Sequence, residues 1–169
     1  RKLRRTSRFR RRAARTWRAE TQIVPLAVAT SDSPAVSIIV PAYGQPLLTF
    51  TCLASIARET TGAYEVIVVD DASPEPLADA LAGVSGVRFE RNPENLGFIG
   101  TCNRAATLAR GSTLVFLNND TIVTPGWLDA LLAVFVAHPD TGLVGAKLVF
   151  PGAGMDARPD IQEKVHVLP

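Results

Sequence analysis

Short apolar runs alternate with amphipathic segments along most of this chain, between residues 36 and 150. Runs bounded by turn-forming residues are typical of buried strands, and we predict strands over residues 36–40, 65–69, 87–90, 114–117 and 143–150. Apolar positions at helical spacing predict helices over residues 46–57, 77–81, 98–110 and 127–137. This alternation indicates an α/β fold in which helices cover both faces of a mostly parallel sheet.

Polar clusters directly follow three of the predicted strands. They are residues 42–45, the pair Asp70 and Asp71, and residues 118–120. In parallel sheets of this kind, ligands bind beyond the carboxyl ends of the strands. The sequence therefore predicts a binding site where the three clusters meet.

The clusters offer defined chemistry, although each also has a structural interpretation. Asp120 and the asparagines before it carry hard oxygen ligands suited to Mg²⁺ or Mn²⁺, or they form an Asx turn or a helix cap. Asp71 can accept a hydrogen bond from the imide of a base such as uracil, or it belongs to a turn. Tyr43 can stack on a base, or it is a core aromatic whose hydroxyl reaches water. Residues 95–97 precede a predicted helix, where an anionic group is favoured.

Composition adds a charge division to this picture. The chain has 169 residues and is 47% hydrophobic, which suits one domain with a sizeable core. Residues 1–19 hold nine arginines, one lysine and no acid, whereas the rest has a net charge of −8. We predict a basic arm and linker over 1–34, the α/β domain over 35–150 and an irregular tail over 151–169. The arm is a solvated tail or a binder of nucleic acid or of an anionic membrane surface.

Two simple features concern the environment of the chain. No apolar run reaches the roughly 18 to 20 residues that a membrane span needs. The two cysteines, Cys52 and Cys102, lie in apolar helical patterns without a metal-ligand spacing, and we interpret them as reduced thiols of a cytosolic protein.

Six motifs in a fixed order carry a resemblance to a known family. They are VSIIVPAYG at 36–44, VIVVDDAS at 66–73, RNPENLGF at 91–98, CNR at 102–104, FLNNDT at 116–121 and TPGWL at 124–128. Over about residues 35–150 the chain closely resembles the family 2 glycosyltransferases, and looks most like their rhamnosyltransferase-like bacterial branch.

The resemblance implies an A-type glycosyltransferase fold that is Rossmann-like. It implies inverting, metal-assisted transfer of a sugar from a nucleoside-diphosphate sugar to a glycan or lipid-linked acceptor, with Mg²⁺ or Mn²⁺. By the same resemblance, Pro41 and Tyr43 pack on the base and Asp71 pairs with it. Asp120 is a metal ligand, with Asn118 in the place of the family's first aspartate and Asn119 near the ribose or phosphates. The positions that would also line the donor site are Asn95, Gly97 and Asn103.

The sequence departs from the family in two ways. Asn118 replaces a carboxylate and lowers the charge expected on the metal site. The family's second half, which holds the catalytic base, is not matched, so we expect a truncated chain with only the donor-binding half and assign no catalytic residue. The alternatives are a non-catalytic nucleotide-binding module and a binder of anionic membranes or, less favoured, nucleic acids through the arm. We expect a cytoplasmic protein, at the inner face of the membrane if the arm binds lipid.

Overall fold

The computed structural model describes residues 25–149 and 165–166. The basic segment 1–19 and most of the predicted tail lie outside the described residues. A four-stranded parallel sheet has the strand order β5-β3-β2-β6, formed by Arg88–Arg91, Tyr64–Asp70, Val36–Ala42 and Thr113–Phe116. The helices are α2 (Pro46–Glu59), α3 (Leu77–Ala80), α4 (Gly97–Leu108) and α5 (Trp127–Ala137). No helix in this part of the chain is long and apolar enough to cross a membrane.

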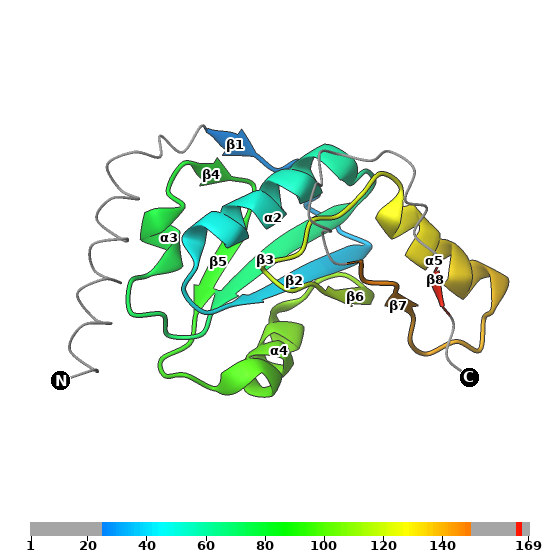
Figure 1. Cartoon of the computed structure of the whole chain (residues 1–169). Coiled ribbons are helices and arrows are strands. Elements are labelled where there is room, and N and C mark those ends of the chain that lie inside the picture. The colour runs from blue at the N-terminus through cyan, green and yellow to red at the C-terminus, as the bar shows by residue number, and fades with distance from the viewer. Residues whose placement is uncertain (1–24, 150–164, 167–169) are drawn as a thin grey trace.

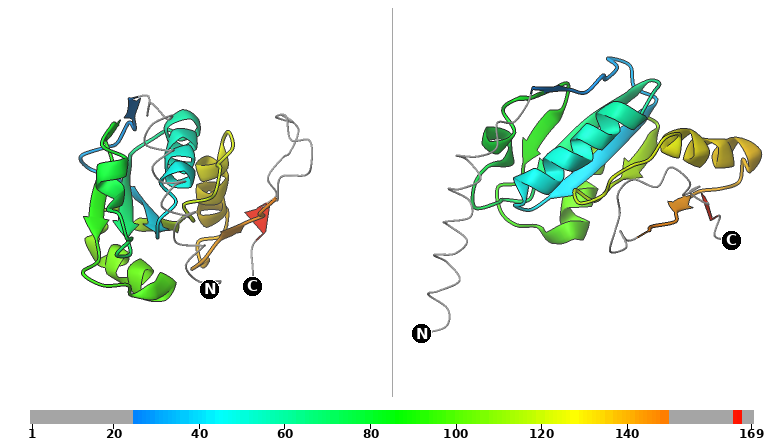
Figure 2. Two further views of the ribbon diagram at one scale, coloured as in Figure 1. Left: turned by 60° about the vertical axis from the view of Figure 1, so that its left-hand side comes forward. Right: turned by 45° about the horizontal axis from the view of Figure 1, so that its top comes forward.

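The two central strands, β2 and β3, are buried on both faces, as is typical of a parallel sheet. Alternate residues of the central strands point to opposite sides: Ile38 and Val66 pack in one cluster with Leu53 of α2. Ile39 belongs to a second cluster with Ala105 of α4. Figures 1 and 2 show α2 and α4 on opposite sides of the sheet. The predicted α/β fold is confirmed, and eight of its predicted elements match to within two residues at each end.

The predicted strand over 143–150 is wrong. In this region the structure has only β7 (Gly145–Ala146), which pairs antiparallel with β8 (Val165–His166) and does not join the main sheet. Leu143 and Leu148 are more than two-thirds exposed. The run is apolar enough for a buried strand, but among the described residues it pairs with no strand of the main sheet, and its leucines stay exposed. The predicted linker also contains a short strand, β1 (Leu26–Ala27), which pairs in parallel with β4 (Val84–Ser85).

Glu65 ties the amino-terminal ends of the central strands to the connection between α4 and β6. Its buried carboxylate accepts hydrogen bonds from the Ser37 hydroxyl (2.7 Å), the Arg110 backbone N–H (2.7 Å) and Arg110 Nε (2.9 Å). The Ser37 hydroxyl in turn accepts from the Gly111 N–H. Burial raises the pKa of Glu65, but the hydrogen bonds and charge of its partners outweigh burial and lower this pKa below its ordinary value.

We therefore expect Glu65→Gln to destabilise the fold in a pH-dependent way. At pH 7 the free energy of unfolding should fall by about 1–3 kcal/mol, because an amide nitrogen would face hydrogen-bond donors. A lowered folded-state pKa means that the carboxylate stabilises the fold above its unfolded pKa of about 4.3 and loses this effect as the pH falls. The difference between variant and wild type should therefore shrink below about pH 4 in urea unfolding followed by circular dichroism. Glu94→Gln, at an exposed position, is the control, and a pH-independent difference would contradict this role of the charge.

Candidate functional site

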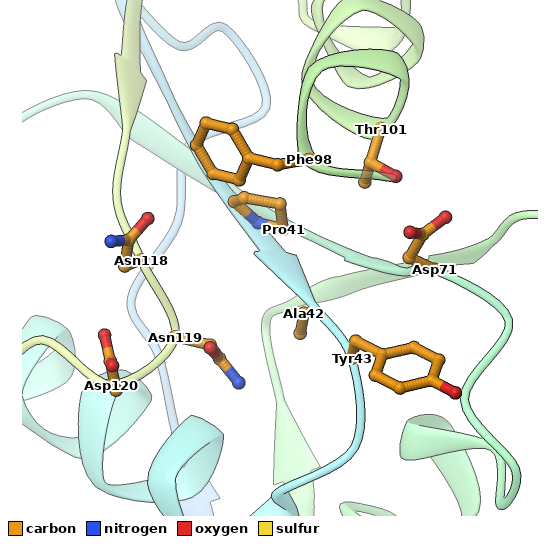
Figure 3. Close-up of a pocket in the computed structure, with 9 residues that line it drawn as sticks. All are labelled: Pro41, Ala42, Tyr43, Asp71, Phe98, Thr101, Asn118, Asn119 and Asp120. Carbon is orange, nitrogen blue, oxygen red and sulfur yellow. The ribbon is translucent and has the colours of Figure 1, made fainter. Parts of the chain in front are cut away.

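A pocket opens beyond the carboxyl ends of β2, β3 and β6, where the sequence predicts a site (Figure 3). The three predicted polar clusters all contribute to it. The residues that line it are Pro41, Ala42, Tyr43, Asp71, Phe98, Thr101, Asn118, Asn119 and Asp120. Figure 3 shows Asp71 and Thr101 on one side of the pocket, with Asn118, Asn119 and Asp120 on the other.

Asp71 is buried and holds the segment that leads into α4. Its Oδ1 accepts from Asn92 Nδ2 at 2.7 Å and from the Leu96 N–H at 2.8 Å, and its Oδ2 accepts from the Gly97 N–H at 3.0 Å. Gly97 has φ of +69°, a left-handed conformation that favours glycine and that turns its N–H toward the carboxylate. The anionic group expected at this helix N-terminus is thus the side chain of Asp71 itself.

The same contacts set the protonation of Asp71. Burial raises the pKa of its carboxyl, but hydrogen bonds from Asn92, Leu96, Thr101 and Gly97 together lower the pKa below its ordinary value. Asp71 is therefore an anion at neutral pH, with at least three of its roughly four acceptor positions already used.

Asp70 organises the turn on the other side of Asp71. Its carboxylate accepts from the Ser73 N–H at 2.8 Å and the Leu77 N–H at 3.2 Å, and it forms an ion pair with Arg91. Arg91 also donates to the Ser73 carbonyl at 2.7 Å. The adjacent residues Arg91 and Asn92 at the end of β5 thus hold the adjacent residues Asp70 and Asp71 at the end of β3.

Tyr43 lies on a loop that is fastened to this turn. The Asp71 N–H donates to the Ala42 carbonyl at 2.8 Å, and the Gly44 N–H donates to the Ser73 hydroxyl at 2.7 Å. The Tyr43 side chain is 54% exposed, and Figure 3 shows it near Asp71 at the pocket. An exposed aromatic ring beside a fixed carboxylate can stack on a flat ligand whose edge donates to that carboxylate. The interpretation of Tyr43 as a core residue is wrong.

The loop of residues 118–120 lies across the pocket and rests on α2. The buried Cys52 thiol donates to the Asn118 carbonyl at 3.7 Å, and Asn119 Nδ2 donates to Thr49 Oγ1 at 3.0 Å. Asp120 is exposed, and its carboxylate makes no hydrogen bond or ion pair within the described part of the chain. Burial, together with the Asp120 carboxylate, raises the pKa of Cys52 to about 12, so the thiol stays neutral.

The oxygen atoms of residues 118–120 suit a divalent cation whose coordination shell is completed by a bound ligand. No group of three or more histidine, cysteine, aspartate or glutamate side chains that could hold a metal occurs among the described residues. Asp120 supplies one unpaired carboxylate, and the carboxamides of Asn118 and Asn119 add hard oxygen atoms. Mg²⁺ commonly binds one or two carboxylates and completes its shell with water and substrate phosphates.

The remaining predicted site residues are not among those that line the pocket. Asn95 does not line the pocket: its Nδ2 donates to the Asp71 carbonyl at 3.3 Å and its Oδ1 accepts from the Gly97 N–H at 3.1 Å. Gly97 acts on the site through Asp71. Asn103 is exposed on α4 and is not among the residues that line the pocket. The analysis of the sequence missed Phe98 and Thr101, which the first two turns of α4 bring to the pocket and which a 3.6-residue periodicity could have placed together.

Asn92 gives a test of the Asp71 contacts. We expect Asn92→Ala to raise the pKa of Asp71, because the variant removes the strongest of the hydrogen bonds that lower it. The variant should also unfold more easily at pH 7, with a smaller difference in acid, since a depressed pKa stabilises the fold only while the carboxyl is ionised. A pH titration of the Asp71 carboxyl carbon by ¹³C NMR measures the shift. Asn103→Ala is the matched control. An unchanged pKa of Asp71 in Asn92→Ala would refute the conclusion that the Asn92 hydrogen bond lowers this pKa.

Comparison with known proteins gives matches over most of the chain. The family model described as glycosyl transferase family 2 matches residues 37–166. The O-antigen biosynthesis protein RfbC of Myxococcus xanthus is 37% identical over 127 residues, which cover 70% of this chain and 10% of that protein. A validoxylamine A glucosyltransferase of Streptomyces hygroscopicus subsp. limoneus is 29% identical over 159 residues, or 88% of this chain and 34% of that enzyme. The chain thus spans a tenth to about a third of these relatives.

Solved structures show the same fold. The crystal structure of S. aureus TarS 1-349 superposes with a TM-score of 0.53 at 23% identity, over 75% of this chain and 38% of that one. The same protein in complex with UDP gives a TM-score of 0.53 at 22% identity, over 66% of this chain and 33% of that one.

Proposed function

This chain belongs to glycosyl transferase family 2, and from this premise we propose that its pocket binds a nucleoside-diphosphate sugar and presents the sugar for transfer to an acceptor. The observation that carries the proposal is the convergence of Tyr43 and Asp71 with Asn119 and Asp120 on two sides of one pocket. TarS, a protein of similar fold, has been solved in complex with UDP, which supports a nucleotide as the ligand.

The two sides of the pocket suit the two ends of a nucleotide. Tyr43 and Asp71 offer a stacking face and a hydrogen-bond acceptor, which suit a base. Asp120, with Asn118 and Asn119, offers oxygen ligands to a divalent cation that accompanies a diphosphate. The N–H groups of Leu96 and Gly97 are occupied by Asp71, so neither is available to a phosphate. We therefore place the base beside Asp71 and the diphosphate beside Asp120.

The contacts of Asp71 favour a base that donates one hydrogen bond. At least three donors already occupy its carboxylate, which leaves at most one acceptor position. The imide of uracil or thymine presents a single N–H between two carbonyl groups. The corresponding edge of guanine presents two adjacent donors and would need both carboxylate oxygens. We propose a uridine or thymidine diphosphate sugar as the donor.

We propose Mg²⁺ or Mn²⁺ as the cofactor, held by Asp120 with Asn118 and the substrate phosphates. When bound, such an ion neutralises charge on the diphosphate leaving group. The chain's own residues stack on the base, accept its N–H and orient the diphosphate toward the cation. The name of the Myxococcus relative, an O-antigen biosynthesis protein, supports a glycan or lipid-linked acceptor.

The proposed reaction inverts the anomeric centre and needs a group that takes the acceptor proton. Among the described residues, Asp71 and Asp120 are the only carboxylates that line the pocket, and both already have a proposed role. General base catalysis typically contributes about 10²- to 10⁴-fold to a rate. We therefore propose that this pocket is the donor-binding half of the active site, and we assign the base to none of its described residues.

Calorimetry with nucleoside diphosphates tests the proposed donor and cation sites directly. We expect UDP or dTDP to bind, GDP to bind at least about tenfold more weakly, and Mn²⁺ to strengthen binding of the preferred nucleotide. Asp120→Ala should lose the part of the affinity that depends on Mn²⁺ and keep the binding measured in EDTA.

Asp140→Ala removes an exposed carboxylate outside the pocket and serves as the control. A chain that is folded by circular dichroism and binds none of the three nucleotides, with or without Mn²⁺, would refute the proposed function. Equal binding of GDP and UDP would refute the role of Asp71 in base selection.

A further inference from the structure

Three small polar side chains of α2 form a stripe beneath the loop that carries Asp120. Thr49, Cys52 and Ser55 are at most 2% exposed and are spaced by three residues, so they lie along one side of the helix. Each contacts the loop: Thr49 through the Asn119 side chain, Cys52 through the Asn118 carbonyl, and Ser55 through the Val123 N–H at 3.1 Å. The position of the loop is thus set from α2.

The Thr49 contact also determines which way the Asn119 carboxamide faces. A hydroxyl has one proton, and Thr49 donates it to the Gln45 carbonyl at 3.3 Å, one turn earlier in the same helix. The hydroxyl oxygen can then only accept, and it accepts from Asn119 Nδ2 at 3.0 Å. With the carboxamide turned over, the hydroxyl proton would have to go to Asn119 Oδ1. The bond to Gln45 would then be lost, and two hydrogen bonds would become one.

This orientation fixes the chemistry that Asn119 presents to the pocket. One N–H of its carboxamide nitrogen is bound to α2, and its Oδ1 has no hydrogen-bond partner among the described residues, so Oδ1 is the free acceptor that Asn119 offers to a ligand. A carboxamide oxygen can accept a hydrogen bond or coordinate a cation, but it cannot donate to a phosphate. Figure 3 shows Asn119 beside Asp120 and across the pocket from Asp71.

We propose that Thr49 is a positioning residue that holds the Asn119 carboxamide with its oxygen toward the donor nucleotide. The inference rests on the proposed function, because it assumes that the pocket binds a nucleotide. The oxygen accepts from an electropositive group of the bound complex, either a ribose hydroxyl or the divalent cation. Thr49 touches neither ligand and acts only through Asn119.

The test compares UDP affinities of wild type, Thr49→Val and Thr49→Ser by calorimetry, in EDTA and in Mn²⁺. Valine keeps the shape of threonine without the hydroxyl, so we expect about tenfold weaker binding, with restoration by serine. A loss of equal size in both buffers assigns the oxygen to a ribose hydroxyl, and a loss confined to Mn²⁺ assigns it to the cation. Thr51→Val is the matched control, because Thr51 donates to Leu47 one turn earlier on the exposed side of α2.

A double-mutant comparison separates positioning from a general structural effect. In an Asn119→Ala background, Thr49→Val should cause no further loss, since the residue through which it acts is gone. Wild-type affinity in Thr49→Val, or a loss that persists in the Asn119→Ala background, would overturn the inference while leaving the proposed function intact. A folded wild type that binds no nucleotide would instead refute the proposed function.

If Thr49→Val does not fold, NMR of the wild-type protein can still test the contact between Thr49 and Asn119. Its NMR spectrum should show nuclear Overhauser effects between the Asn119 side-chain amide protons and the Thr49 methyl group. Their absence, with the Asn119 amide resonances assigned from Asn119→Ala, would overturn the inference.

Discussion

The site depends on the need to satisfy two adjacent buried carboxylates at the end of β3. Asp70 and Asp71 are both buried, so an unpaired charge on either would be costly. Because neighbouring residues of a strand face opposite ways, the two carboxylates require separate donors. Arg91 with the Ser73 and Leu77 N–H groups serves Asp70, and Asn92 with the N-terminus of α4 serves Asp71. Residues 70–77 and residues 91–97 are thereby fixed relative to each other.

The opposite side of the pocket is held by hydrogen bonds between neutral groups, which are weaker than those to a carboxylate. The loop of residues 118–120 rests on the polar stripe of α2 through one hydroxyl, one thiol and one further hydroxyl, and Asp120 itself is free of protein partners in the described part of the chain. This asymmetry matches the proposed ligand. The proposed base would be recognised by a rigid carboxylate with a single acceptor position left, whereas a cation needs an unsatisfied oxygen that water can reach.

Periodicity and strand ends were sufficient to predict most of the fold and the location of the pocket. The central strands are buried on both faces, so their apolar runs carry a strong signal, and parallel strands bring the residues after them to one edge. The donors that hold Asp71 could not be predicted, because Asn92 becomes its neighbour through the pairing of β5 with β3, and Thr101 through the packing of α4 against the sheet. The orientation of Asn119 depends likewise on Thr49, 70 residues earlier. The run at 143–150 misled because apolar character alone does not show whether a strand has a neighbour.

The asparagine at position 118 has a physical consequence under the proposed function. At least three of the roughly four acceptor positions of Asp71 are used by the protein, and the proposed base takes the remaining one, so Asp120 is the one carboxylate among the described pocket residues that can meet a cation. A single exposed carboxylate binds Mg²⁺ or Mn²⁺ weakly in water, because hydration competes with it. A diphosphate brings further negative oxygens to the same place, so the cation is held firmly only when the nucleotide is present. Asn118 thus lowers the affinity of the free site for metal and makes cation binding depend on the donor.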